Sequence, residues 1–331
     1  MKKITYVSVF TGIGGFDLAA QSLGMECQFM CELDKYACQT LHANFKVPND
    51  LPNDITKIDI LPAHDLLLAG FPCQDFSFAG QRKGFAGDRG KLFYELLRVI
   101  QRNQPKYFLL ENVRMNPDIH KQITISLEGI GYRVFNEILN SKDFGVPQNR
   151  KRNFWVGFRK DIAPLFFQFP HYHLQTRLID ILEKDVDPKY NLSERYLTSL
   201  KAREARHKAK GNGFTYPPLD PQGVANTIHV GGASKEANLI SMYFTDHTKA
   251  NIKNIHQQRD TSYTWDTSGN NQAVEQQSTI RRLTPREYAR LQGFPDSFKF
   301  AVSESQLYKQ FGNAVTVPVI TAILKSLFSQ I

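Results

Sequence analysis

The feature that most constrains the fold is an alternation, in the first half of the chain, of short apolar segments with segments of helical periodicity. Strands are predicted over residues 4–10, 26–32, 65–71 and 106–113, helices over 16–24, 34–45 and 91–104, and two closing strands over 132–140 and 152–158. This alternation predicts a parallel α/β sheet with helices on both faces. Ligands bind such sheets beyond the carboxyl ends of the strands. Residues 11–15, Glu32, 71–73 and 111–113 follow strand ends and are therefore predicted to share one crevice.

Composition narrows the class of protein. The 331-residue chain has no run of about eighteen apolar residues, the length that predicts a transmembrane helix. Its formal charge of +9 at pH 7 favours a polyanionic partner such as nucleic acid. Its four cysteines include no CxxC pair, which argues against a disulfide framework or a structural zinc site. We therefore expect a reduced, cytoplasmic protein with no metal site.

The alternation is lost between about residues 167 and 277, which are polar and rich in turns, basic residues and amides. This part predicts a second domain of short strands and long loops. Helical patterns return near residue 281, and residues 308–328 predict one long apolar helix that packs back on the first domain.

A glycine turn at residues 10–16, "FTGIGGF", follows the first predicted strand and precedes a helix. Its glycines allow close approach of the backbone to a ligand, but the spacing is not that of a dinucleotide or P-loop motif. Glu32 ends the second strand, where an acid can bind ribose hydroxyls. Together, the glycine turn and Glu32 favour a site for S-adenosylmethionine over one for NAD. The alternative is that the turn is only structural and that Glu32 is a surface residue.

Cys73, in "GFPCQDFS", follows a buried strand and a proline, which is a position that presents a thiol. Cys27, Cys31 and Cys38 fit inert core positions better. Arg82 is too distant for a phosphatase loop, and no resolving cysteine lies nearby.

Glu111 ends an otherwise apolar strand. Burial raises the pKa of a carboxyl group, which would let Glu111 donate a proton to a ring nitrogen. A structural pair with a neighbouring arginine is the alternative.

Seven segments carry a family resemblance: "FTGIGGF", "GFPCQDFS", "RGKLF", "ENV", "QNRKR", "RRLTPREYARLQGFP" and "FGNAV". In order and rough spacing they resemble the DNA (cytosine-5)-methyltransferases, the prokaryotic type II modification methylases. The resemblance covers the chain apart from about a hundred residues before residue 281. It implies a Rossmann-like S-adenosylmethionine-dependent methyltransferase fold with a mixed seven-stranded sheet. It also implies a catalytic domain of residues 1–165 and 305–331 and a target-recognition domain of residues 166–304.

The resemblance implies methyl transfer to cytosine C5 in double-stranded DNA through base flipping and a covalent Cys73–C6 adduct. Glu111 would act at N3 and Arg152 would contact the base. Arg150 would support the site, and Asn112 would hold the loop of Pro72 and Cys73.

The implied binding residues form two sets. Those for the cofactor are Phe10, Gly12, Ile13, Gly15, Glu32, Leu33, Asp54, Ile55, Phe71, Leu92 and Asn313. Those for DNA are Ser77, Gln81, Arg82, Lys83, Arg89 and Thr227. The one departure is Ser8, where the family commonly has an aspartate.

Three alternatives remain. A transfer-RNA cytosine-5 methyltransferase of this fold is expected to carry a C-F-T signature, which is missing here. A non-catalytic DNA-binding homologue is disfavoured by the intact Cys73, Glu111 and Arg152, and a nicotinamide oxidoreductase leaves the Cys73 loop unexplained. "HKAKGNGF" (residues 207–214) is similar to a stretch in enzymes of CC-containing palindromes such as CCGG or CCWGG. A cognate restriction endonuclease and a monomeric state are also expected.

Overall fold

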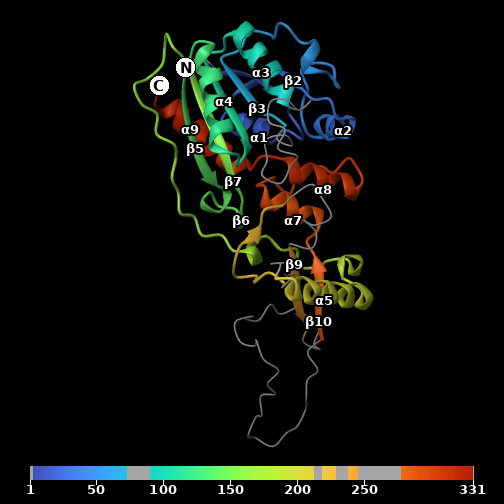
Figure 1. Ribbon diagram of the computed structural model, residues 1–331. Coiled ribbons are helices and arrows are strands. Elements are labelled where there is room, and N and C mark those ends of the chain that lie inside the picture. Colours follow the sequence, from blue (N-terminus) through green and yellow to red (C-terminus); the bar gives the residue numbers. More distant parts are fainter. Residues whose placement is uncertain (1–2, 73–89, 212–217, 229–237, 245–276, 331) are drawn as a thin grey trace, which may run out of the picture.

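A mixed β-sheet forms the centre of the molecule. The computed structural model describes residues 3–72, 90–211, 218–228, 238–244 and 277–330. The sheet order is β2-β1-β3-β4-β7-β5, in which β1 to β4 are parallel and β7 and β5 run antiparallel (Figure 1). The strands are β1 Thr5–Val9, β2 Glu26–Cys31, β3 Leu66–Gly70, β4 Tyr107–Val113, β5 Tyr132–Asn140 and β7 Lys151–Arg159.

The predicted α/β fold with a mixed sheet is confirmed, but the strand count is wrong for the described residues, where the sheet has six strands and not seven. The segment before β7 turns away from the sheet. Its two-residue strand β6 (Gln148–Asn149) pairs with β8 (Ala225–Asn226), and the Pro147 carbonyl accepts the Ala225 N–H at 2.7 Å. This pair forms a separate two-stranded sheet.

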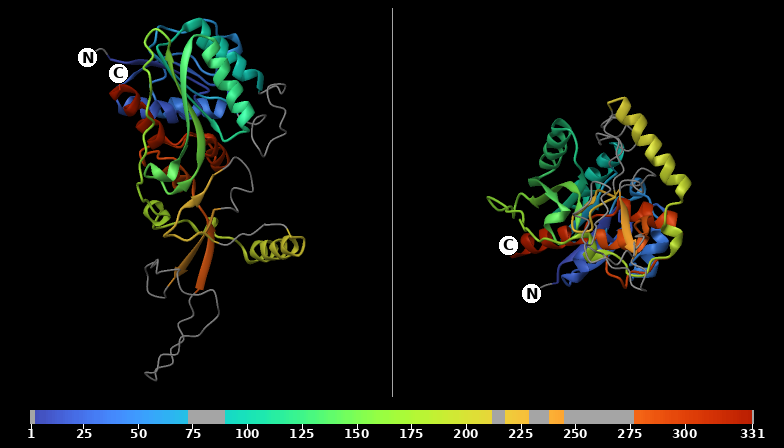
Figure 2. Two further views of the ribbon diagram at one scale, coloured as in Figure 1. Left: turned by 60° about the vertical axis from the view of Figure 1, so that its left-hand side comes forward. Right: turned by 90° about the horizontal axis from the view of Figure 1, so that it is seen from below.

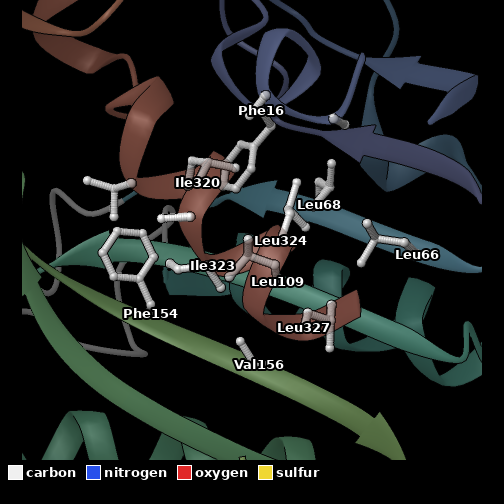
Figure 3. Close-up of a cluster of buried hydrophobic side chains, with 14 of the residues drawn as sticks. Phe16, Leu66, Leu68, Leu109, Phe154, Val156, Ile320, Ile323, Leu324 and Leu327 are labelled. Atoms are coloured by element: carbon white, nitrogen blue, oxygen red, sulfur yellow. The ribbon is translucent and has the colours of Figure 1, made fainter. Parts of the chain in front are cut away.

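Both faces of the sheet are covered because successive side chains on each strand point to opposite sides. Leu66 and Leu68 pack in one cluster with α1 (Gly15–Ser22) and α9 (Val317–Ser329). Leu67 and Ala69 pack in the other cluster with α3 (Gly90–Asn103) and α4 (Pro117–Gly129). Figure 3 shows α9 lying across the sheet, with Phe16 of α1 beside it. Strands buried on both sides fix the positions of their carboxyl ends.

The C-terminal segment is two helices, α8 (Glu304–Asn313) and α9, so the prediction of one long helix is wrong. At the break, Pro318 in the first turn of α9 has no N–H, and the Val317 N–H bonds to the carbonyl of Gln292, which lies after α7 (Pro285–Leu291) and not in α8. Residues Glu304–Ser329 are long and apolar enough to cross a membrane by composition, but 61% of their most apolar window is buried inside the protein, as in a core helix.

A third cluster lies beside the carboxyl ends of the parallel strands. It joins Ile13 and Ala37 to Leu178, Ile228 and residues of α7 (Pro285–Leu291) and α8. Beyond it lie β9, β10 and α5 (Figure 1). The remaining elements are α2 Lys35–Asn44, α5 Glu194–Ala209, β9 Leu239–Phe244, β10 Gln277–Arg282, and the 3₁₀ turns η1 Ile55–Lys57, η3 Ser141–Asp143, η4 Leu178–Ile181 and η5 Pro188–Tyr190.

Candidate active site

One cavity of about 710 Å³ opens at the carboxyl ends of β1, β3 and β4. Every residue predicted for the cofactor lines it, as do four of the residues predicted for catalysis. The lining residues from these two sets are Phe10, Gly12, Ile13, Gly15, Glu32, Leu33, Asp54, Ile55, Phe71, Leu92 and Asn313, with Glu111, Asn112, Arg150 and Arg152. Residues that are up to about 300 positions apart in sequence thus meet in one space.

The glycine turn after β1 forms one wall of this cavity. Gly12 has φ +61°, and a Cβ built there would meet nothing within 4 Å, so the turn leaves open space on the ligand side. Gly15 is needed for packing, because its Cβ would lie 2.8 Å from Cγ2 of Val315. Phe10 also lies in the left-handed region, at φ 54°, although it is not a glycine. Strained backbone of this kind clusters at binding sites.

Beneath the turn lies a buried polar group centred on Asp17. The hydroxyl of Ser8, the residue that departs from the family pattern, donates to Asp17 Oδ1 at 2.9 Å and lies 3.0 Å from the Thr11 hydroxyl. The Thr11 hydroxyl also donates to the carbonyl of Cys31 at 3.1 Å, which ties the ends of β1 and β2 together. Burial raises the pKa of Asp17 to about 6. Ser8 therefore supports the turn without entering the cavity.

Glu32 stands at the end of β2 with both oxygens engaged. Oε2 accepts the Gly12 N–H at 2.7 Å, and Oε1 accepts the N–H groups of Leu33 and Asp34 at 2.9 and 2.7 Å. Burial raises the pKa of Glu32, and these three N–H groups oppose the rise. Of the roughly four lone-pair sites of the carboxylate, these three bonds leave one, on Oε2, that can accept a ligand hydroxyl.

The far wall of the cavity is made by Asp54 and its neighbours. Asp54 accepts the Thr56 N–H at 3.0 Å, which lowers the pKa of its carboxyl group and begins η1. Asn53 accepts the Glu32 N–H at 3.1 Å and so joins this wall to β2. The rim is polar and exposed: Lys309 of α8 bonds to Asp34 at 2.9 Å.

Glu111 and Arg152 form an ion pair inside the cavity. Glu111 Oε1 lies 3.2 Å from Nε of Arg152, and the two side chains are only 11% and 12% exposed. The pair follows from strand register, since β4 and β7 are antiparallel and Val113 lies opposite Arg152. Burial raises the pKa of Glu111, and Arg152 and Arg150 oppose this rise. The structural pair that the sequence left as an alternative is therefore present, and its arginine is itself one of the predicted catalytic residues.

Asn112 fixes the chain just before the predicted nucleophile. Its side-chain amide donates to the carbonyl of Phe71 at 3.1 Å. The Phe71 ring packs against Phe93 and Trp155, with ring centroids 5.5 and 6.2 Å apart. Pro72 lines the cavity, and Cys73 lies outside the described residues.

Arg150 joins three parts of the chain. Its guanidinium donates to the carbonyl of Ile228 at 2.9 Å and to those of Gly312 and Ala314 at 3.2 and 3.0 Å. The residue is 3% exposed. Arg150 therefore fixes the position of the segment after β8 relative to the cavity wall around Asn313.

The sequence reasoning missed the amide groups that surround Arg150. Gln148 accepts the Ile228 N–H at 3.1 Å and donates to the carbonyl of Leu291 at 2.8 Å. Gln292 donates to the carbonyl of Ala314 at 3.0 Å and accepts from the Thr316 hydroxyl at 2.8 Å. Both glutamines stood inside motifs, "QNRKR" and "RLQGFP", but nothing in one sequence distinguishes a buried amide from an exposed one.

Of the residues predicted to bind DNA, the described structure includes one, Thr227. It is partly buried, does not line the cavity, and donates from its hydroxyl to the carbonyl of Asn149 at 2.6 Å. The others lie outside the described residues: Ser77, Gln81, Arg82, Lys83 and Arg89.

The sequence of this chain is similar to those of known DNA methyltransferases. The family model for C-5 cytosine-specific DNA methylases matches residues 4–329. The type II methyltransferase M.HpaII of Haemophilus parainfluenzae is 43% identical over 344 residues, covering 100% of this chain and 90% of that protein. The type II methyltransferase M.DsaV of Dactylococcopsis salina is 37% identical over 341 residues, covering 100% and 87%.

Solved structures agree in fold. The Entamoeba histolytica methyltransferase EhMeth has a TM-score of 0.71 at 18% identity, covering 100% of this chain and 99% of that one. The S. pombe Dnmt2 methyltransferase has a TM-score of 0.70 at 18% identity, covering 99% of each chain. The family expected from the motifs is confirmed: the chain belongs to the C-5 cytosine-specific DNA methylases and is a DNA (cytosine-5)-methyltransferase of the type II restriction–modification kind.

Proposed function

We propose that this enzyme transfers the methyl group of S-adenosylmethionine to C5 of one cytosine in a short double-stranded DNA sequence, through a flipped base and a covalent adduct with Cys73. The observation that carries the proposal is the single cavity, in which the glycine turn and Glu32 face the same space as the Glu111–Arg152 pair. A methyl donor and an acceptor base can therefore meet there.

The cavity suits S-adenosylmethionine in three ways. Its volume of about 710 Å³ is within the range of small-molecule sites. Gly12 leaves room where a side chain would intrude, and Oε2 of Glu32 has a lone-pair site left for a ribose hydroxyl. Asp54 and Ile55 are placed to meet the adenine, and Phe10, Ile13, Phe71 and Leu92 supply apolar contact. When bound, S-adenosylmethionine supplies an electrophilic methyl group.

The acceptor carbon needs activation, because C5 of an aromatic cytosine is a weak nucleophile. The Cys73 thiolate adds to C6, forming a C–S bond, and the electron pair of the C5–C6 bond makes C5 nucleophilic. After C5 has been methylated, it loses its proton to a base. The C–S bond then breaks, the thiolate leaves, and aromaticity returns.

Glu111 and Arg152 stabilise the charge that develops on the ring during this addition. A protonated Glu111 donates a hydrogen bond to N3, which draws off electron density as the thiolate adds. Its raised pKa favours the protonated form that this role needs. Arg152 contacts the base and holds the Glu111 carboxyl group in place, while Asn112 holds Phe71 ahead of the nucleophile.

The base must leave the duplex to reach the cavity, at a cost of a few kcal/mol. We propose that residues 1–165 and 305–331 form the catalytic domain and residues 166–304 the target-recognition domain. Thr227 is assigned to sequence recognition. Ser77, Gln81, Arg82, Lys83 and Arg89 are assigned to the DNA contacts made next to the nucleophile.

The biological setting is also a proposal. The enzyme acts as a cytoplasmic monomer and protects host DNA from a cognate restriction endonuclease of the same sequence. The stretch at residues 207–214 favours a CC-containing palindrome such as CCGG or CCWGG as the recognised sequence.

Bisulfite sequencing tests the proposal directly. The purified enzyme is incubated with unmethylated DNA and S-adenosylmethionine, and protected cytosines are mapped. Protection that recurs in one short palindrome supports the proposal and gives the sequence. Methyl transfer to RNA only, or cofactor binding without transfer to DNA, contradicts it.

A further inference from the structure

Helix α5 (Glu194–Ala209) carries a stripe of positive charge that no role described above uses. Arg195, Ser199, Arg203, Arg206 and Lys210 follow one another at spacings of 4, 4, 3 and 4 residues, so they lie on one face of the helix and of its C-terminal extension. The two glutamates of the helix, Glu194 and Glu204, fall on other faces. The stripe therefore contains no acidic residue, while Lys201 and Lys208 share the other side of the helix with the glutamates.

The helix is anchored at one point and otherwise exposed. Leu200 is 2% exposed and packs with Leu239, and Ile280 and Leu192 lie against that pair. Leu192 also bonds through its N–H to the carbonyl of Ile280 at 2.9 Å. Both views of Figure 2 show α5 projecting sideways from the rest of the described chain. A rigidly held, projecting helix is suited to contact a large partner.

The exposed cations of the stripe have no ion-pair partner among the described residues. Arg195, Arg206 and Lys210 are exposed, and in the described part of the chain none of them joins an ion pair. Basic residues in a last helical turn can serve only to stabilise the helix dipole, which would explain Arg206. Arg195 does not fit that explanation, because it lies in the first turn, where the dipole disfavours a cation.

We propose that this stripe, Arg195, Arg203, Arg206 and Lys210, binds the phosphate backbone of duplex DNA. It spans about 22 Å, close to the length of six base pairs at about 3.4 Å each. The one buried apolar residue of α5, Leu200, is used in packing, and the stripe itself contains no apolar residue, so it offers no apolar face to a membrane. The inference rests on the proposed recognition of double-stranded DNA and names a contact that carries affinity without sequence information.

The test measures DNA binding against salt concentration, with a 30-base-pair duplex, for the parent and Arg195→Gln/Arg206→Gln. Each lost phosphate contact should flatten the slope of log affinity against log salt by about 0.9. The variant therefore binds the duplex more weakly than the parent at 50 mM salt. The ratio of the parental affinity to the variant affinity falls about tenfold between 50 and 200 mM salt. The preference for the recognised sequence and the affinity for S-adenosylmethionine stay unchanged.

Three controls separate the outcomes. Lys160→Gln/Lys325→Gln removes the same charge from exposed sites away from α5 and should keep the parental slope. Arg195→Lys/Arg206→Lys keeps both positive charges and should show the parental slope. Ser199→Glu adds a carboxylate to the middle of the stripe and should also flatten the slope. It replaces the double glutamine variant in the test if that variant does not fold.

Several results would overturn the inference. The inference is wrong if the α5 variants keep the parental salt slope, or if their slope changes only as much as that of the Lys160/Lys325 control. It is also wrong if the variants change the sequence preference, or if they affect binding to duplex RNA alone. If the parent methylates DNA and the α5 variants keep the parental salt slope, the role of the stripe is refuted and the proposed function is not affected. A parent that binds no DNA refutes both.

Discussion

The sheet region and the region beyond its carboxyl ends bury their side chains in different ways. Leu66, Leu67, Leu68 and Leu109 are fully buried, and two large apolar clusters cover the two faces of the sheet. In α5 only Leu200 is buried. The sheet region can therefore hold a cavity wall in place by packing alone. Beyond the third cluster, α5 relies on a few apolar anchors and presents polar surface, which suits contact with a long charged substrate.

Each region also buries a carboxyl group, and each satisfies it differently. Asp17, under the glycine turn, has a hydroxyl donor in Ser8, and its Oδ2 has no partner in the described structure. Glu287 of α7 receives two hydrogen bonds from the Arg281 guanidinium, at 2.7 and 2.8 Å, with both side chains at most 2% exposed. Burial raises the pKa of the first carboxyl group, and an opposite charge compensates the second.

The largest expected effect separates chemistry from binding in the sheet region. Cys73→Ser should lower kcat at least about 10³-fold, because a hydroxyl is far less ionised than a thiol at neutral pH. Cofactor affinity should stay nearly unchanged. Methyl-transfer assays and calorimetry of cofactor binding measure the two. Turnover above a few per cent of the parent would remove the covalent mechanism.

The buried pair in the region of α7 should be the most costly to break. Glu287→Gln leaves Arg281 charged and buried, which should lower the free energy of unfolding by about 3–5 kcal/mol. Urea denaturation measures it. Asp296→Asn, in an exposed pair with Arg290, is the matched control and should cost at most about 1 kcal/mol. Equal losses in the two variants would show that burial does not distinguish these pairs.

Glu111 tests the chemistry proposed for the ion pair in the cavity. Glu111→Gln should lower kcat by about 10²- to 10³-fold, since a neutral amide donates a weaker hydrogen bond to the developing charge. Stability should fall less than in Glu287→Gln, because Arg152 is 12% exposed and lines an open cavity, whereas Arg281 is 2% exposed. Glu128→Gln, on the exposed surface of α4, is the control. A stability loss with unchanged kcat would make Glu111 a purely structural residue.

The smallest effect concerns Asp17 and the pH dependence of stability. Its folded-state pKa of about 6 lies above the usual aspartate pKa of 3.8, so the folded protein binds a proton more tightly than the unfolded chain. The stability contribution is complete below about pH 4 and is lost as the pH rises through 6. Asp17→Asn should remove that loss, a difference of about 2–3 kcal/mol between pH 4 and pH 7.

Denaturation of the parent and of Asp17→Asn across this pH range measures the effect. Asp50→Asn, at an exposed site, should keep the parental profile. An unchanged profile in Asp17→Asn would show that another group causes the pH dependence.

The sequence by itself determined the strands, most helices, the family and the residues around the cavity. Strand periodicity is local, and each buried strand ends in a distinctive residue such as Glu32 or Glu111, so linear order was enough to predict that they meet. The seven motifs also indicated the family, because their order along the chain can be compared without knowing the fold.

Only the tertiary structure decided the break between α8 and α9, the pairing of β6 with β8, and the bonds of Arg150 to Ile228 and Ala314. Each depends on partners far apart in sequence that satisfy backbone groups in the interior. A buried carbonyl must find a donor, but the sequence does not say which donor lies near it. Local pattern therefore predicts the elements, and long-range hydrogen bonding decides how they join.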